Sequence, residues 1–297
     1  MLYRGLFAGC SAWSHVFVLL VSILIGSLFA SLISMGLLSA WGGLDVSMYD
    51  NPGLMRAVQF ISAIGTFLIP SFVVAWVSSS SVADYLSLRK VSDSAVWLYA
   101  GVGVVLLSPV INVLSWVNRQ MVLPDFLAPV EQWMRLQEEQ AQRLVEVMLS
   151  GGGIISLLAN LIVVAVTAAV VEEFFFRGVM QRILGRCMSN HHLVIWLTAF
   201  LFSAFHLQFF GFIPRLVLGA YLGYLLYWSR SIWVPVFAHF VNNAIVVVAM
   251  SFPDLKECEF VTGEIAGEDI LVYVCVAVVA LLFFVWAQKQ LRHHLMP

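Results

Sequence analysis

Eight stretches of this chain are apolar over about the 20 residues that a helix needs to cross a bilayer. They are residues 13–40, 54–78, 95–117, 154–180, 193–210, 212–228, 232–252 and 270–287. Inside lipid, every backbone N–H and C=O group must find a partner within the protein, and a helix satisfies these groups within one segment. The sequence therefore predicts an all-α polytopic membrane protein, a bundle of about eight transmembrane helices.

The composition agrees with this prediction. Of the 297 residues, 61% are hydrophobic and only 11% are charged, whereas about a quarter of a soluble domain is charged. We treat the chain as a single membrane domain, with two helices in residues 1–80, a core in 81–252, and an acidic outer loop and the last helix in 253–297. The net charge is -2, and no basic stretch with interleaved aromatic residues indicates a nucleic-acid partner.

The charged residues between the apolar stretches divide into two groups. If the N-terminus is inside, only Asp84 and Asp93 oppose the inner basic residues, which are Arg4, Arg89, Lys90, Arg182, Arg186, Arg230, Lys289 and Arg292. The outer segments are acidic and hold Asp45, Asp50, Asp125, Glu131, Glu138, Glu139, Glu146, Asp254, Glu257, Glu259, Glu264, Glu268 and Asp269, against Arg56, Arg119, Arg135, Arg143 and Lys256. Because basic loops stay in the cytoplasm, both termini are predicted to be cytoplasmic.

One long connection, residues 123–150, carries a helical pattern of its own. An apolar face can form from Trp133, Leu136, Leu144, Val147 and Met148. The pattern is typical of an amphipathic helix that lies at an interface or caps the bundle. A solvated helix whose apolar face packs on the other helices fits the pattern equally well.

Few strongly polar side chains remain within the apolar stretches: Glu172, Glu173, Arg177, His206, Arg215, His239, Asn242 and Asn243. Ionisable groups are expensive inside a membrane and mark candidate functional sites. Arg215 lies near the start of its stretch, close to the outer boundary, so we expect it to extend to the interface. Asn242 is expected to form a hydrogen bond between helices.

Helical spacing separates the two adjacent glutamates. Residues four apart share a helix face, so Glu173 can pair with Arg177, while Glu172 is turned about 100° away. The same spacing puts Phe202 beside His206 and His239 beside Asn243. The Glu173–Arg177 pair could also have only a structural role and fix how the helices pack.

Depth along the helices brings these groups to one level. Glu172 lies 14 residues before Arg186, and His206 lies 15 residues after His191, so each is about 21 Å from the turn that joins the two stretches. His239 and Asn243 reach about 14 to 20 Å beyond Arg230. We therefore predict a polar cavity within the membrane, reached by water, that is lined by the residues Glu172, His206, His239 and Asn243.

Such a cavity suits hydrolysis without a covalent nucleophile. A carboxylate beside a histidine can activate water, and imidazole or amide donors can stabilise an oxyanion. Neither Ser203 nor Ser251 sits in a GxSxG turn, and the four cysteines form no CxxC pair. Zinc held by Glu172, His206 and His239 is an alternative, although the HExxH spacing is absent.

Three short motifs resemble those of a known family. Glu172 to Arg177 is similar to EExxxR, Phe202 to His206 to FxxxH, and His239 to Asn243 to HxxxN. These motifs, in this order, are typical of the CPBP intramembrane proteases, also called Abi or CAAX-protease-like. The resemblance covers roughly residues 80 to 250 and includes the upstream phrase ADYLSLRK.

The resemblance implies a role for each motif. Glu172 and His206 would activate water, His239 and Asn243 would form the oxyanion hole, and Glu173, Arg177 and Phe202 would support them, in a cavity open to the cytosol. It implies an endopeptidase of a bacterial-type plasma membrane that cleaves a membrane-associated or lipidated protein or peptide. No cofactor is expected, and zinc is the alternative.

Two other functions fit the sequence. One is a non-catalytic immunity or scaffold protein of the same family, which keeps the motifs without proteolysis. The other is a transporter that uses the buried charges for coupling; no inverted repeat of the kind common in transporters is evident in the sequence.

Overall fold

The computed structural model describes residues 4–42, 50–252, 255, 265 and 267–295. Over these residues the fold is helical and contains no strand. Seven helices are long and apolar enough to cross a membrane: Ala12–Trp41, Pro52–Ser78, Ser94–Arg119, Gly153–Cys187, Phe209–Ser229, Trp233–Ser251 and Ile270–Leu295. The prediction of an all-α polytopic membrane protein is confirmed.

The predicted stretch 193–210 is the exception. Its helix, α10 (His191–Ala204), has only 14 residues. The chain leaves the helix in a tight turn, in which the His206 N–H donates to Ser203 O and Leu207 adopts a left-handed conformation with φ 53°. A residue with a β-carbon, such as leucine, rarely adopts that conformation. Its presence in an apolar stretch therefore does not mark a turn in the sequence. His206 thus lies in a turn and not within a helix.

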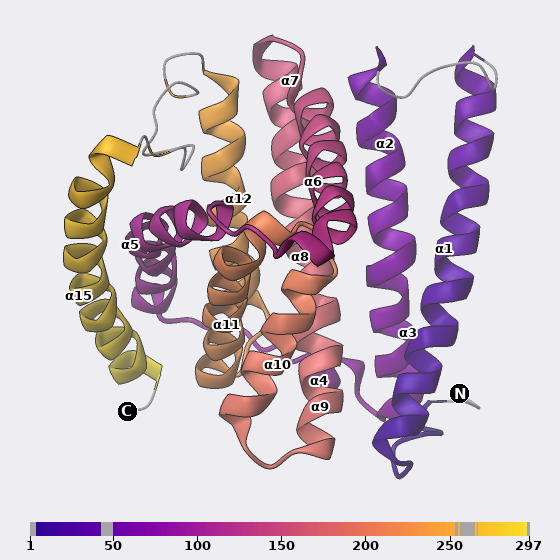
Figure 1. Ribbon diagram of the computed structural model, residues 1–297. Helices are drawn as coiled ribbons and strands as arrows, with labels where there is room; N and C mark the ends of the chain where they lie inside the picture. Colours follow the sequence, from indigo (N-terminus) through magenta and orange to yellow (C-terminus); the bar gives the residue numbers. More distant parts are fainter. Residues whose placement is uncertain (1–3, 43–49, 253–254, 256–264, 266, 296–297) are drawn as a thin grey trace.

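One long helix forms the centre of the bundle (Figure 1). It runs through α7 (Gly153–Asn160), the π-helical η4 (Leu161–Thr167), α8 (Ala168–Glu173), the π-helical η5 (Phe174–Met180) and α9 (Gln181–Cys187). Phe174, Phe175 and Phe176 are all buried, although successive residues on a helix point about 100° apart. Neighbours therefore surround this helix on all sides, among them α10, α11 (Phe212–Ser229) and α12 (Trp233–Ser251).

Two helix pairs flank the centre on opposite sides (Figure 1). On one side, α1 (Ala12–Gly42) packs on α2 (Pro52–Ala63), η2 (Ile64–Leu68) and α3 (Ile69–Ser78). Gly26 and Gly65 allow this approach, because a Cβ on Gly26 would overlap the carbonyl oxygen of Gly65. On the other side, α15 (Ile270–Leu295) packs on α5 (Ser94–Arg119).

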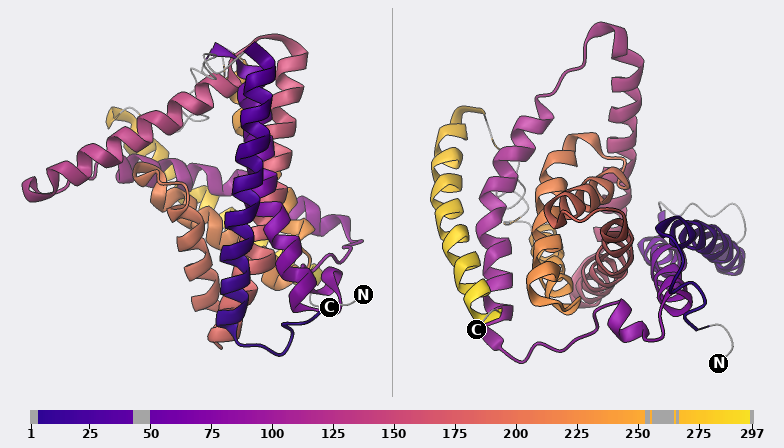
Figure 2. Two further views of the ribbon diagram at one scale, coloured as in Figure 1. Left: turned by 90° about the vertical axis from the view of Figure 1, so that its right-hand side faces the viewer. Right: turned by 90° about the horizontal axis from the view of Figure 1, so that it is seen from below.

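Helix α6 (Ala128–Leu149) stands out from the bundle (Figure 2). Of the predicted apolar face, Met148 is buried, whereas Trp133 and Leu136 are nearly half exposed. The Trp133 ring packs on the ring of Phe209 at a centroid distance of 5.3 Å, and Met134 is buried as well. The exposed residues fit a face at the membrane interface and the buried ones fit a face packed on the bundle, so both alternatives stay predictions.

The two ends of the bundle differ in charge. Helix α1 begins and α15 ends at the same end, where α9 also ends (Figure 1). Arg182 and Arg186 lie in α9, Arg230 follows α11, and Arg292 is in the last turn of α15. This agrees with the predicted basic side. Of the predicted outer acidic residues, several lie outside the described residues: Asp45, Asp254, Glu257, Glu259 and Glu264.

Candidate active site

The central helix holds a fully buried ion pair. Arg177 Nη1 donates to Glu173 Oε1 at 2.7 Å, and both side chains are completely inaccessible to solvent. Arg177 Nη2 also donates to the carbonyl oxygen of Gly219 at 2.9 Å, and its Cζ lies 4.5 Å from the centre of the Phe202 ring. The predicted pairing of Glu173 with Arg177 is confirmed. It occurs where the α-helix passes into the π-helical η5, a feature often found at functional sites.

His239 lies between the two adjacent glutamates. Its Nδ1 is 2.8 Å from Glu173 Oε1, and its Nε2 is 3.8 Å from Glu172 Oε2. An ionised carboxylate can only accept, so Nδ1 carries the proton of the first contact. The second distance is too long for a direct hydrogen bond. Glu172 therefore keeps its carboxylate oxygen available, and its side chain is 21% exposed while that of Glu173 is inaccessible.

His206 is fixed by the backbone of α10. Its Nδ1 is 2.8 Å from the carbonyl oxygen of Phe202, and a carbonyl accepts, so Nδ1 is the donor. In the neutral ring, Nε2 then has a free lone pair. The Phe202 ring stands edge-on to both histidines, with centroid distances of 5.1 Å to His206 and 5.9 Å to His239. His206 also interacts electrostatically with Glu172.

Asn243 lies one turn beyond His239 on α12 and is held by another helix. Its Nδ2 donates to Val164 O at 3.2 Å, in the π-helical η4. Asn242, which was expected to bond between helices, donates instead to its neighbour Asn243 Oδ1 at 3.1 Å. The link between helices thus passes through Asn243, and one of its two amide N–H bonds is already used.

A polar chain beside the site escaped sequence reasoning. Arg215 does not extend alone to the interface as expected: its Nη2 donates to Gln208 Oε1 at 2.6 Å. Gln208 in turn donates to Glu138 Oε1 on α6 at 3.1 Å. Arg215 also interacts electrostatically with Glu172. Nothing in the spacing pointed to Gln208 or Glu138, because this chain joins α6 to the turn after α10, far apart in sequence.

Zinc is the alternative cofactor predicted for these residues. Among the residues that the structure describes, no group of three His, Cys, Asp or Glu side chains is placed to hold a metal ion. His239 Nδ1 and His206 Nδ1 both face hydrogen-bond acceptors, so Nε2 of each ring stays free. Metal-bound histidines commonly have this arrangement, so zinc on Glu172, His206 and His239 stays an alternative.

The structure brings together six of the seven predicted residues through direct contacts: Glu172, Glu173, Arg177, Phe202, His206 and His239. A cavity of about 740 Å³ lies next to them at the basic end of the bundle. Of the cluster, only Arg177 lines this cavity. A common cavity lined by Glu172, His206, His239 and Asn243 stays a prediction.

Comparison with known proteins finds one family model that part of the chain matches. Residues 154–245 match the family model described as Rce1-like, type II CAAX prenyl endopeptidase Rce1-like. The matched residues contain all three motifs, which confirms the resemblance predicted from them. At the level of the family, the match supports an intramembrane endopeptidase of the CAAX-protease type. No curated protein and no solved structure matches the chain.

Proposed function

We propose that this protein is an intramembrane endopeptidase that hydrolyses a peptide bond of a membrane-associated or lipidated protein or peptide. One observation carries the proposal: Glu172 keeps a partly exposed carboxylate next to two histidines whose Nδ1 atoms are already bound. Both rings are thereby held in one orientation, with Nε2 left for the reaction. A partly exposed carboxylate with fixed imidazole rings nearby can activate a water molecule for attack.

In the first step, Glu172 acts as the general base. It takes a proton from a water molecule, which His206 orients by accepting a hydrogen bond at Nε2. The oxygen of this water attacks the peptide carbonyl carbon and forms a tetrahedral intermediate. The protonated Glu172 then returns the proton to the leaving amine as the C–N bond breaks, so that atoms and charges balance.

The oxyanion of the intermediate is received by His239 and Asn243. His239 Nδ1 already donates to Glu173, so Nε2 must carry a second proton in order to donate to the oxyanion. His239 then acts as an imidazolium between Glu172 and Glu173. Asn243 has one amide N–H bound to Val164 and offers its other N–H. Donors of this kind typically contribute 10²- to 10³-fold to the rate.

Glu173, Arg177 and Phe202 are positioning residues in this proposal. Glu173 fixes His239 through Nδ1, and Arg177 holds Glu173 in place while it is itself tied to Gly219. Phe202 provides the carbonyl that orients His206 and a ring that contacts both histidines. No step uses a metal ion.

The site would act within a bacterial-type plasma membrane, with both termini in the cytoplasm. The basic residues gathered at the end where the chain starts and finishes support this orientation. The substrate would approach through the bilayer, because the helices around the site are apolar.

The test compares wild-type protein with Glu172→Gln, which keeps the size and polarity of the side chain. We expect Glu172→Gln and His206→Gln each to lower the cleavage of a farnesylated CAAX-type peptide by about 10²- to 10⁴-fold. Glu139→Gln, at an exposed position on α6, is the matched control and should retain full activity. The ends of membrane proteins, compared by mass spectrometry in cells with wild-type and Glu172→Gln protein, would identify natural substrates.

Equal cleavage by wild type and both variants would contradict the proposal. A folded wild-type protein that cleaves no peptide, and whose cellular effect survives Glu172→Gln, would favour the non-catalytic immunity or scaffold protein instead. Size-exclusion profiles and thermal unfolding in detergent establish that each variant is folded.

A further inference from the structure

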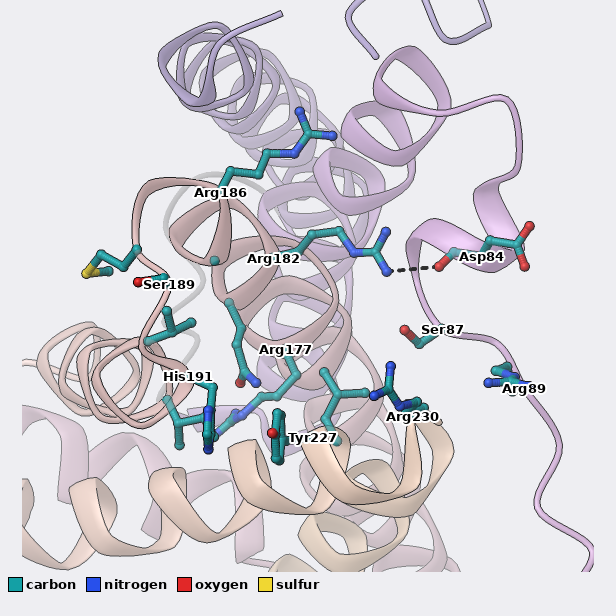
Figure 3. Close-up of a pocket in the computed structure, with 16 residues that line it drawn as sticks. Asp84, Ser87, Arg89, Arg177, Arg182, Arg186, Ser189, His191, Tyr227 and Arg230 are labelled. Atoms are coloured by element: carbon teal, nitrogen blue, oxygen red, sulfur yellow. Dashed lines mark hydrogen bonds between the residues drawn. The ribbon is translucent and has the colours of Figure 1, made fainter. Parts of the chain in front are cut away.

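The cavity of about 740 Å³ lies where the loop before α5, the end of α9, the start of α10 and the end of α11 meet (Figure 3). Five arginines line it: Arg89, Arg177, Arg182, Arg186 and Arg230. Its one acidic residue is Asp84 of the short helix α4 (Val82–Tyr85). A volume of this size suits a small-molecule ligand, since such sites typically measure about 300 to 1,000 Å³.

Most of this positive charge has no carboxylate partner. Arg177 is neutralised by Glu173. Arg182 donates to the backbone oxygen of Asp84 at 3.0 Å, and the Asp84 carboxylate points away from it in Figure 3. Within the part of the chain that the structure describes, no ion pair joins a carboxylate to Arg89, Arg182, Arg186 or Arg230. The cavity is therefore strongly positive and suited to an anion.

The wall of the cavity is held together by contacts between distant segments. Ser231 Oγ donates to Arg89 O at 2.5 Å, and the Ile232 N–H donates to Ser87 O at 2.9 Å. Ser87 and Arg230 both adopt left-handed backbone conformations, with φ of 56° and 52°. Such conformations persist in residues other than glycine only where the surroundings hold them. The backbone that carries Arg89 and Arg230 is therefore held in place by these contacts.

The lining also has hydroxyl and apolar parts. Ser87, Ser189 and Tyr227 bring hydroxyl groups, and Gln181 Oε1 is buried without a hydrogen-bond partner. An apolar side is formed by Met188, Val194, Ile195 and Leu226. An anion with both polar hydroxyl groups and an apolar portion would satisfy all of these features, whereas an inorganic ion would leave the apolar side unused.

We propose that this cavity binds the phosphate headgroup of an anionic phospholipid, from the leaflet at the end of the bundle where α1 begins and α15 ends. Guanidinium groups bind phosphate oxygens in pairs of charge-assisted hydrogen bonds. Basic pockets between transmembrane helices on the cytoplasmic side are suited to such headgroups. The unpartnered Gln181 oxygen would accept from a headgroup hydroxyl. The binding of a headgroup here does not require peptide cleavage, although Arg177 belongs to both the cavity and the candidate active site.

Native mass spectrometry of the full-length protein in detergent, titrated with phosphatidylglycerol or phosphatidylcholine, tests the proposal. We expect phosphatidylglycerol to bind at least about tenfold more tightly, which corresponds to about 1.4 kcal/mol. Both lipids carry a phosphate, but the arginines repel the choline cation of phosphatidylcholine, which also has no hydroxyl to donate to Gln181. The double variant Arg182→Gln/Arg230→Gln should lose this preference, and Arg182→Lys/Arg230→Lys should keep most of it. Arg119→Gln/Arg135→Gln removes two arginines elsewhere and should bind as wild type does.

Equal binding of the two lipids by wild-type protein would overturn the proposal, and so would an unchanged preference in Arg182→Gln/Arg230→Gln. Should that variant fail to fold, Arg89→Gln, at an exposed position, should still weaken phosphatidylglycerol binding several-fold, and no weakening would count against the site. Inorganic phosphate forms the third arm. If it binds as tightly as phosphatidylglycerol and displaces it, the cavity belongs to the free ion and the lipid assignment is wrong.

Discussion

Two Glu–Arg pairs in this protein have the same helical spacing and nearly the same length. Arg135 donates to Glu131 at 2.6 Å on α6, and Arg177 donates to Glu173 at 2.7 Å in the central helix. Arg135 is half exposed, whereas both members of the central pair are inaccessible. Geometry alone would rank these pairs as equal, but their surroundings make them different.

Burial decides what each pair can do. The exposed pair is screened by water and contributes little to stability. In the buried pair each charge depends on the other, because removing one leaves the second unpaired and without solvent. That dependence holds Glu173 in place, and Glu173 in turn holds His239. The same i,i+4 spacing therefore has little effect on the exposed helix α6, whereas in the central helix it positions a candidate catalytic residue.

The largest expected effect is that of Arg177→Met. This change leaves Glu173 buried without its cation and removes the contact with Gly219, so we expect the free energy of unfolding to fall by about 3–5 kcal/mol. Equilibrium unfolding in mixed detergent micelles measures it. Arg135→Met is the matched control on the exposed pair and should leave stability unchanged within error. Similar losses in both variants would contradict the role given to burial.

Removing both charges should restore part of the stability. Glu173→Leu/Arg177→Met replaces the pair with apolar side chains, and such replacements of buried pairs are often neutral. We expect the double variant to be more stable than Arg177→Met by about 2 kcal/mol in the same unfolding experiment. Peptide cleavage should remain lost, because His239 Nδ1 has no acceptor. A double variant as unstable as the single one would show that the pair is needed for packing itself.

Phe202→Leu tests the aromatic side of the buried pair. The ring covers the Arg177 guanidinium and touches both histidines. Losing a buried cation–π contact and some ring volume is expected to lower the free energy of unfolding by about 1–2 kcal/mol. Phe126→Leu, at a position that is 79% exposed, is the control and should change little. Equal effects would mean that the ring contacts contribute nothing beyond volume.

The smallest effect concerns pH at the exposed pair. Hydrogen bonding to Arg135 first, and to the Leu123 N–H second, lowers the pKa of Glu131 below its usual value of 4.5. A lowered pKa in the folded state means that the contact stabilises the fold above 4.5 and is lost as the pH falls through the folded-state pKa. The amide resonance of Leu123 should therefore titrate with a midpoint below 4.5 and stop titrating in Glu131→Gln. A midpoint at or above 4.5 would contradict the contact.

Local spacing was enough to predict the buried pair. Glu173 and Arg177 are four residues apart, and within an apolar stretch a carboxylate has no nearer cation. Depth counting likewise put Glu172, His206 and His239 at one level, and the three side chains do lie in one cluster. Both predictions rest on the constant rise and turn of a helix, which the sequence carries in its residue numbers.

Other features depend on contacts that spacing does not record. The π-helical η4 and η5 could not be predicted from the sequence. A π-helical turn holds one more residue than an α-helical turn, and in a continuously apolar segment this leaves no pattern to recognise. The short α10 and its left-handed Leu207 were missed for the same reason. Arg215, Gln208 and Glu138 come together only because α6 folds back over the turn after α10.

The sequence by itself determined that this chain forms apolar helices, that one of them carries a charged pair, and that a second carboxylate points elsewhere, because helix geometry and the expense of charge in lipid are local properties. Only the tertiary structure decided which partner each group received. His239 binds Glu173 and only faces Glu172, and five arginines from three segments share one cavity. Packing between helices brings these residues together, and their separation along the chain carries no signal.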